Sequence, residues 1–499
     1  MGLKIKVKKE VRKDYLSLTR RDRICGKIIE YGILGLIIFS PLPAASVGEW
    51  PILVIQLTVL VMMAAYFLMK EKPQNNEFLS LSLKWPKYLF LGLFVLIFIQ
   101  IIPLPEFLVK VFSPNSYSFN KLFSTGFSEI KFMSLSLVPS HTLREGLEHL
   151  SYFILGFLIV KTITSRRQIM RIFSVLIAMG VIEAFYGLFE LYNKNPRILF
   201  YKKMDYLDSV TGTFVNRNHL SGYLEMIIPL ALGLIIARMD LFSLAGLKWR
   251  KKLLRLSEKG LSTNLLMSLG IIVMSLAIIF SKSRSGIFLL VFTFILFFGL
   301  TVLYFKGTLH QKRGIKNVLR IVFLIIFFIS LYIGIDSTVE RFSLDKLLQE
   351  IRPTYWANTM SLFSEFPLFG TGLGTFASLY PDYEEGGIPV RIFHAHNDYL
   401  EYLSELGIVG MSLLLGGILF MVINSFIIWR VRKYPLVKGL SLGGIVAAIC
   451  ILIHSITDFN LHIPANMMLF SVVLSLTVVT AFYKRNKGTS KDKRVKIKE

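Results

Sequence analysis

Residues 286–305 read GIFLLVFTFILFFGLTVLYF, a run of 20 residues without a charged side chain. A helix of this length spans the hydrocarbon core of a bilayer, which needs about 20 consecutive apolar residues. Similar runs recur along the chain of 499 residues, of which 54% are hydrophobic and only 18% are charged. Soluble domains carry more charge and fewer apolar residues. We therefore expect an all-α, polytopic integral membrane protein rather than a string of soluble domains.

About twelve apolar runs are candidate transmembrane helices. They cover residues 27–45, 51–69, 87–104, 148–164, 170–190, 220–237, 264–281, 286–305, 319–335, 406–429, 438–457 and 465–482. We expect a membrane domain over residues 27–483, between a basic N-terminal segment (1–26) and a basic tail (484–499). The first run shows no evident small-residue cleavage site, which favours a retained span over a removed signal peptide.

The formal net charge of +25 could indicate a nucleic-acid partner. The basic residues flank the apolar runs instead, in alternate segments: 1–26, 161–171, 248–255, 306–316, 430–433 and 484–499. Cytoplasmic segments of membrane proteins are enriched in Lys and Arg, so this alternation predicts both termini in the cytoplasm and no nucleic-acid partner. Cys25 and Cys450 suggest neither a disulfide framework nor a metal motif.

Three long segments fall on the predicted outer side, at 105–147, 191–219 and 336–405. In the first, PEFLVKVFSPNSYSFNKLF (105–123) has the apolar spacing of a helix lying at the interface. The third precedes the tenth span, and we expect its aromatic residues to order it, with a helix around 354–365. Its Gly372-x-Gly374-x-Phe376 run lacks the context of a phosphate loop, so we interpret it as a turn that lets the segment fold over the site.

Arginines recur on the predicted outer side. Outer segments of membrane proteins usually carry few Lys and Arg, because these residues are enriched on the cytoplasmic side. Arg217 lies at the mouth of the sixth span, Arg284 in a very short turn and Arg352 in the largest segment. A charge at the membrane boundary is costly without a partner, and the guanidinium fork matches phosphate, so a lipid-linked diphosphate would suit Arg217 and Arg284. Two alternatives stay open: Arg284 as an anchor that snorkels to the headgroups, and Arg352 as a partner of Glu350 or another acid.

The stretch HAHNDYLE (394–401) gathers polar residues before the tenth span. Asp398 and Glu401 resemble a capping box, which predicts that a helix starts there. We expect His394 to be structural, whereas His396 could accept a proton from a sugar hydroxyl. Zinc binding by the two histidines with Asp398 is the alternative, but the spacing is too tight for a typical helical site and no other His or Cys cluster supplies ligands. We therefore expect no metal.

Six stretches of the sequence, taken in their order along the chain, resemble the O-antigen ligase and polymerase superfamily of bacterial polyprenyl-linked glycan transferases. The resemblance covers most of residues 95–430, with a ligase-like region at about 205–425. It rests on IIPLPEFLVKVFSP (101–114), PSHTLREGLEHLSYF (139–153), GTFVNRNHLSGYLEMIIPLAL (212–232), SKSRSGIFLLV (281–291), RPTYWANTMSLFSEFPLFGTGLGTFASLYP (352–381) and HAHNDYLEYLSELGIVG (394–410).

The resemblance implies a glycosyltransferase of lipopolysaccharide or exopolysaccharide assembly. It would transfer a glycan from undecaprenyl diphosphate to an acceptor hydroxyl at the outer face of the inner membrane, inverting the anomeric centre without metal or cofactor. The acceptor would be lipid A core for a ligase or another lipid-linked repeat for a polymerase. A flippase or transporter is the rival from a different class; it predicts charges near the middle of the spans, where Glu183 is the main exception here.

Matching motifs imply roles for individual residues. Arg217 and Arg284 would bind the diphosphate with support from Arg352, and His396 would act as base or position the acceptor. His394, Asn397 and Asn218 would be supporting residues. The sequence departs from the family pattern in two places: Arg217 stands between two asparagines where a small residue or proline is usual, and His394 is an additional histidine. The resemblance therefore supports Arg284 more strongly than Arg217, and it leaves open which of His394 and His396 is nearer the chemistry.

Overall fold

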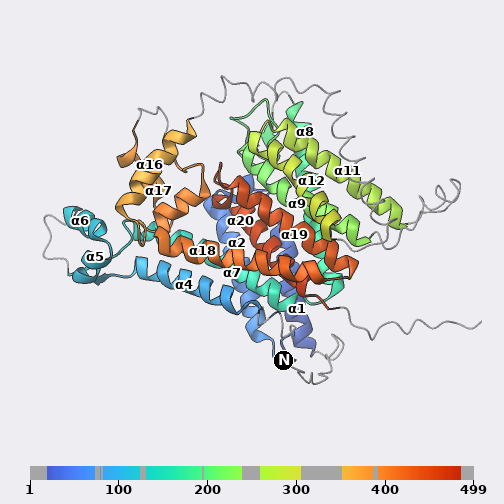
Figure 1. Cartoon of the computed structure of the whole chain (residues 1–499), viewed down its shortest axis with the longest axis horizontal. Coiled ribbons are helices and arrows are strands. Elements are labelled where there is room, and N and C mark those ends of the chain that lie inside the picture. The colour runs from blue at the N-terminus through green and yellow to red at the C-terminus, as the bar shows by residue number, and fades with distance from the viewer. Residues whose placement is uncertain are drawn as a thin grey trace, which may run out of the picture.

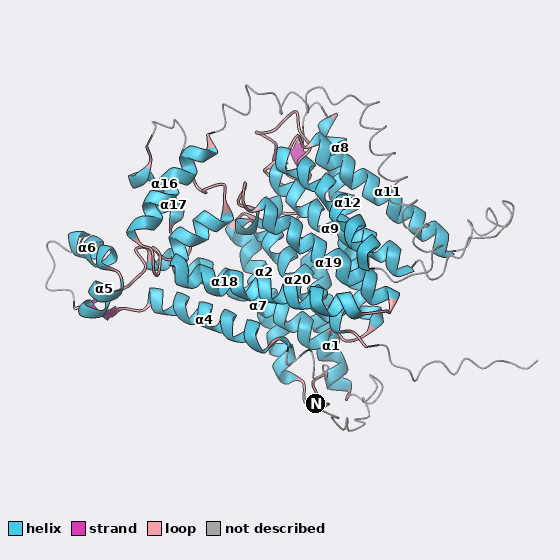
Figure 2. Ribbon diagram, in the orientation of Figure 1, coloured by secondary structure: helices cyan, strands magenta, loops and turns pink. Residues whose placement is uncertain are grey.

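The computed structural model describes residues 19–73, 79, 82–123, 131–193, 196–238, 259–304, 351–385 and 391–484. Its longer helices are α1 (Arg20–Phe39), α2 (Glu49–Leu68), α4 (Lys84–Ile101), α7 (Pro139–Thr162), α8 (Arg166–Leu191), α9 (Arg217–Arg238), α11 (Lys259–Phe280), α12 (Arg284–Tyr304), α16 (Arg352–Glu365), α18 (Asp398–Val431), α19 (Pro435–His454) and α20 (Pro464–Phe482). The shorter helices are η2 (Ala44–Ser46), α5 (Glu106–Phe112), α6 (Pro114–Phe123), α17 (Phe376–Leu379), η5 (Tyr380–Tyr383) and η6 (Asn460–His462). Helices dominate the chain, as predicted (Figure 1 and Figure 2).

The described strands are short and form two antiparallel pairs. Strand β1 (Leu104–Pro105) pairs with β2 (Phe132–Met133), with Leu104 opposite Met133. Strand β3 (Arg197–Ile198) pairs with β4 (Tyr201–Lys202), with Ile198 opposite Tyr201. Both pairs lie in connections between long helices, so they shape loops rather than build a core.

Nine helices in the described part of the chain are long and apolar enough to cross a membrane: α2, α4, α8, α9, α11, α12, α18, α19 and α20. The chain is therefore a multi-pass membrane protein. The predicted spans at 27–45 and 148–164 fall on α1 and α7, which are as long but carry more charged residues and are not among the nine. The predicted span at 319–335 lies outside the described residues, so the count of twelve stays a prediction.

The helix predicted over residues 105–123 is instead two short helices, α5 and α6. Ser113 ends α5 with φ −148° and ψ 81°, because the residue before Pro114 is disfavoured in the helical region. The helix expected at 354–365 is confirmed by α16. Asn115 of α6 donates to the carbonyl oxygen of Glu365 in α16 at 2.8 Å, and these short helices lie together beside the main bundle (Figure 1).

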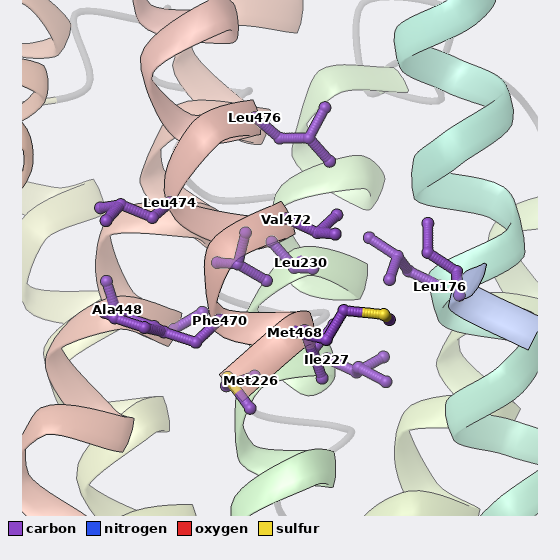
Figure 3. Packing of buried hydrophobic residues seen from close by; sticks show 14 of the residues in the cluster. Leu176, Met226, Ile227, Leu230, Ala448, Met468, Phe470, Val472, Leu474 and Leu476 are labelled. Carbon is purple, nitrogen blue, oxygen red and sulfur yellow. The ribbon is translucent and has the colours of Figure 1, made fainter. Parts of the chain in front are cut away.

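Helix α9 is the centre of the core. All residues of its apolar membrane-spanning stretch are buried, as are 89% of the residues in the corresponding stretches of α19 and α20. Side chains of α8, α9, α19 and α20 interdigitate there (Figure 3). A Cβ at Gly233 of α9 would lie 2.4 Å from the carbonyl oxygen of Gly439 in α19. Glycine at this crossing thus lets two membrane helices approach closely.

Helix α18 is broken at Gly407, whose φ is +63°. Residues of the preceding loop supply partners for the backbone groups at the break: Ile408 N–H donates to the Pro367 carbonyl at 2.9 Å and Val409 N–H to the Leu368 carbonyl at 3.2 Å. Irregular backbone at membrane depth is tolerated where protein satisfies it in this way. The Gly-rich run is a turn, as predicted, and it docks onto this break.

Several turns meet at one end of the bundle, among them parts of the outer segments predicted at 191–219 and 336–405. They are residues 40–48, 192–193, 196–216, 281–283, 455–463 and the described part of 351–397, and we call this the polar end. Thr213 Oγ1 donates to the Pro41 carbonyl at 2.6 Å, and Val210 N–H to the Phe280 carbonyl at 3.0 Å. Turns far apart in the sequence are thus joined directly, which brings their polar side chains together.

Candidate active site

Asp458, in the turn between α19 and α20, is the centre of the polar end. Its buried carboxylate accepts hydrogen bonds from Asn218 Nδ2 at 2.6 Å and from His396 Nδ1 at 3.2 Å. Arg352 Nη2 and His219 Nε2 each lie 3.8 Å from it. Burial alone would raise the pKa of Asp458, but His219, His396 and Arg352 hold it well below its usual range. The turn thus presents a fixed negative charge.

His396 is held against this carboxylate by its backbone and its ring contacts. Its φ is +51°, a region that non-glycine residues seldom adopt and that clusters at functional sites. Tyr355 of α16 stacks on the imidazole with centroids 6.1 Å apart, and Phe459 meets it edge-on at 4.8 Å. Because a carboxylate only accepts, Nδ1 carries the proton of the neutral ring and Nε2 carries the lone pair. The side chain is 27% exposed, so Nε2 can act as a base toward a ligand.

Arg352, the first residue of α16, joins the large loop to the same turn. Its Nη1 donates to the carbonyl oxygen of Thr457 at 2.7 Å, and its side chain remains 20% exposed. Asp458 is thus an acid beside Arg352 in the structure. The alternative partner Glu350 lies outside the described residues, so that alternative stays open. The guanidinium fork at this position can also face an anionic ligand.

Arg217, the first residue of α9, is buried beside the loop that precedes it. Its Nη1 donates to Ser209 Oγ at 3.2 Å, and its guanidinium lies over the Tyr206 ring, 4.9 Å from the centroid. Burial raises the pKa of the Tyr206 phenol, while the charges of both Arg217 and Arg352 lower it. The two arginines therefore act on one phenol, next to Asp458.

Arg284, the first residue of α12, is half-buried at the same end. The neighbouring Ser285 Oγ lies 2.8 Å from Thr457 Oγ1, the residue before Asp458. Lys282, in the turn before α12, has a φ of +57° and donates to Asp208 at 2.7 Å. These contacts place the start of α12 beside the Asp458 turn. The sequence had placed Arg284 on the same side of the membrane as Arg217 and Arg352.

His394 belongs to a second network of acids and histidines, which shares the Phe459 ring with His396. His394 Nδ1 lies 2.7 Å from Glu401 Oε1, and its ring stacks on Phe459 at 4.1 Å. His462 Nδ1 lies 2.6 Å from Asp398 Oδ1, and His462 Nε2 lies 3.5 Å from Glu401. Burial works against protonation, but these two carboxylates raise the pKa of His462 to about 10. The two histidines of the HAH stretch are thus paired with different acids.

The predicted capping box is wrong. Helix α18 does begin at Asp398, but its cap is Asn397, whose side chain accepts from Tyr399 N and Leu400 N. Asp398 and Glu401 bind histidines and backbone amides of other segments instead, as the contact of Ala395 N with Glu401 Oε2 at 2.8 Å shows. Asn397 is therefore a structural residue of this helix start.

The principal residue that the sequence did not reveal is Asp458, with Tyr206 and His219 beside it. The stretch HSITDFNLH (454–462) carries two histidines and an aspartate in a short turn between two apolar runs. The same reasoning that singled out Arg284 could have found it. Within the described ranges, no group of three or more His, Cys, Asp or Glu is arranged to hold a metal.

A family model described as O-antigen ligase matches residues 269–415. That segment runs from α11 into α18 and includes Arg284, Arg352 and His396, whereas Arg217 and Asp458 lie outside it. No curated protein matches the chain.

Proposed function

Because the chain belongs to the O-antigen ligase superfamily, we propose that it transfers a glycan from undecaprenyl diphosphate to an acceptor hydroxyl. The reaction takes place at the polar end, which faces the periplasm, with both termini in the cytoplasm. The single observation that carries this proposal is the pairing of His396 with the buried carboxylate of Asp458, which also lies beside Arg352.

His396 is the general base of the proposed reaction. The acceptor oxygen forms a bond to the anomeric carbon while the bond from that carbon to the diphosphate oxygen breaks. The hydroxyl proton passes to Nε2 of His396, and Asp458 stabilises the resulting imidazolium through Nδ1. A single displacement of this kind inverts the anomeric centre.

The arginines hold the leaving group. A diphosphate gains negative charge as the glycosidic bond breaks, and fixed guanidinium groups stabilise that charge without reorganising. Arg217 and Arg284 are the principal contacts, and Arg352 supports them. Stacking on Tyr206 fixes one of these forks before the substrate arrives.

The acceptor is assigned by glycan profiling of a deletion strain. Long glycans left on the carrier lipid indicate a ligase that modifies lipid A core, whereas single unlinked repeats indicate a polymerase. Re-expression of the wild-type chain restores the normal profile and the His396→Ala variant does not. A normal profile in the deletion strain overturns the proposal.

A glycan transporter is the second candidate, because charged residues buried inside spans are typical of transport pathways. Glu225 of α9 and His454 of α19 form such a pair, with Nδ1 3.0 Å from Oε2 and both side chains fully buried. A transporter would move a lipid-linked glycan across vesicles without making a glycosidic bond. Formation of a new glycosidic bond by the purified protein decides for the transferase.

A further inference from the structure

A pocket of about 510 Å³ lies at the polar end, and its lining includes none of the residues assigned to the proposed reaction. One wall is lined by Pro43 and Gly48 of the α1–α2 turn and by Trp50 at the start of α2. The other is lined by Tyr201 of β4 and the residues that follow it. Ligand pockets of proteins commonly enclose about 300–1,000 Å³. The cavity is therefore large enough for a small organic ligand.

The lining combines aromatic faces with polar groups. Trp50 is 54% exposed and Tyr201 is 53% exposed, so both rings are accessible. Phe39 packs against Trp50 at 5.9 Å and 74°, which fixes the indole at the rim. Lys203 and Asp205 add hydrogen-bonding groups to the same cavity. Sugar rings need this mixture, because their C–H faces pack on aromatic rings and their hydroxyls need polar partners.

Tryptophan and tyrosine are also common at membrane interfaces, where they merely anchor a helix. Membrane anchoring does not explain the polar groups in the wall formed by the residues that follow β4. Lys203 is buried, and its ammonium donates to the carbonyl oxygen of Ser209 at 2.7 Å. Burial lowers the pKa of Lys203 to about 8. The Lys203 side chain is therefore mostly protonated at pH 7. Its ammonium group has two further N–H bonds that can donate to a ligand.

The pocket adjoins the candidate diphosphate site through one short loop. Lys203 bonds the backbone of Ser209, and the Ser209 hydroxyl accepts from Arg217 at 3.2 Å. In this loop, residues 203–205 line the pocket, while Tyr206 and Ser209 contact Arg217. On the other side, Thr213 bonds both the Pro41 carbonyl and Glu183, which ties the α1–α2 turn to the same loop. The two walls are joined without a ligand.

From this arrangement we infer that the pocket is a subsite for a sugar residue of the lipid-linked donor glycan. The inference rests on the proposed function and adds where the donor's sugar is held. With the diphosphate at Arg217, the glycan extends along residues 203–209 into the cavity. Trp50 and Tyr201 stack on the sugar, and Lys203 and Asp205 bond its hydroxyls.

Direct binding tests this subsite independently of turnover. Two probes are used with the purified protein in nanodiscs: undecaprenyl-diphosphate glycan extracted from the deletion strain, and undecaprenyl diphosphate without sugar. Trp50→Ala and Tyr201→Ala are each expected to weaken binding of the glycan-bearing lipid about tenfold, the loss of roughly one aromatic stacking contact. Binding of the bare carrier is expected to stay unchanged.

Trp85→Ala is the matched control, because Trp85 is 60% exposed at the start of another membrane helix and does not line the pocket. Trp50→Phe should recover most of the affinity. Equal weakening of both probes would mean that the pocket holds the carrier lipid and would overturn the sugar subsite. Unchanged glycan binding in both alanine variants would overturn it as well. Neither outcome depends on whether the protein transfers the glycan.

Discussion

Nδ1 of His396 lies 3.2 Å from Oδ1 of Asp458, a residue 62 positions further along the chain. The first residue comes from the end of a long loop and the second from a tight turn between two core helices. The positive φ of His396 shows that this loop end is held in an unusual backbone conformation. The carboxylate fixes the tautomer and the orientation of the imidazole, so that Nε2 is left to act as the base.

Asp458→Asn is expected to lower glycan transfer about a hundredfold or more, since the amide cannot stabilise an imidazolium as the carboxylate does. Protein level and membrane insertion should stay normal, because the isosteric side chain still accepts from Asn218. Transfer is measured with a lipid-linked donor in membranes. Asp382→Asn, an exposed aspartate of the large loop before α18, serves as control and should be silent. Equal activity of the two variants would exclude a role for Asp458.

Arg284→Ala is expected to reduce transfer to about 1% or less, because one fixed charge at a leaving diphosphate commonly contributes a factor of about a hundred to a thousand. Arg284→Lys should restore little, since an ammonium lacks the planar fork. Arg391→Ala, an exposed arginine of the large loop, is the comparison for general charge loss. A fully active lysine variant would show that only the charge matters.

Gly407→Ala tests the break in α18. A Cβ at this position would lie 2.3 Å from the carbonyl oxygen of Leu368, and the φ of +63° is strained for alanine. The backbone strain alone should cost about 1–3 kcal/mol of unfolding free energy. Gly416→Ala in the same helix is the control, since its nearest neighbour would be 3.8 Å away. Thermal unfolding in detergent should show a lower midpoint for the first variant only.

The His462 network predicts a pH-dependent stability. The pKa of His462 is about 10 in the folded protein, above its ordinary value of 6.5. Between these two pH values the folded state therefore binds a proton that the unfolded state has lost. The stabilisation is complete below about pH 6.5 and is lost as the pH rises through 10. The unfolding midpoint of the wild type should therefore fall over this range. His462→Gln should flatten that slope, and an unchanged slope would contradict the assignment.

The apolar runs predicted most of the membrane helices because a run of about 20 residues has few other stable arrangements. Helix ends were less predictable. The apolar run that predicts the tenth span begins near residue 406, whereas helix α18 begins at Asp398, where the polar residues predicted a helix start. The break at Gly407 also escaped prediction, because it depends on backbone partners supplied by residues 367 and 368.

The site was predictable only in part, for a related reason. Arg217, Arg284, Arg352 and His396 stand out because charges at a membrane boundary are costly. Asp458 gains its position from contacts with Asn218 and His396, far away in the sequence. The predicted capping box is wrong because the Asn397 side chain accepts the free backbone N–H groups at the start of α18. Asp398 and Glu401 lie beside His462 instead, which follows them by about 60 residues. Local patterns identify residue types, whereas tertiary contacts decide which residues pair.

The most direct test of the central claim compares His396→Ala with His394→Ala in a reconstituted transfer assay. Both histidines are partly exposed and paired with acids, but only His396 contacts Asp458. The donor is the lipid-linked glycan extracted from a deletion strain, and new glycosidic bonds are counted by mass spectrometry. We expect His396→Ala to lose at least about a hundredfold in rate and His394→Ala to retain most of the activity. A His396→Ala enzyme with the wild-type rate would contradict the account.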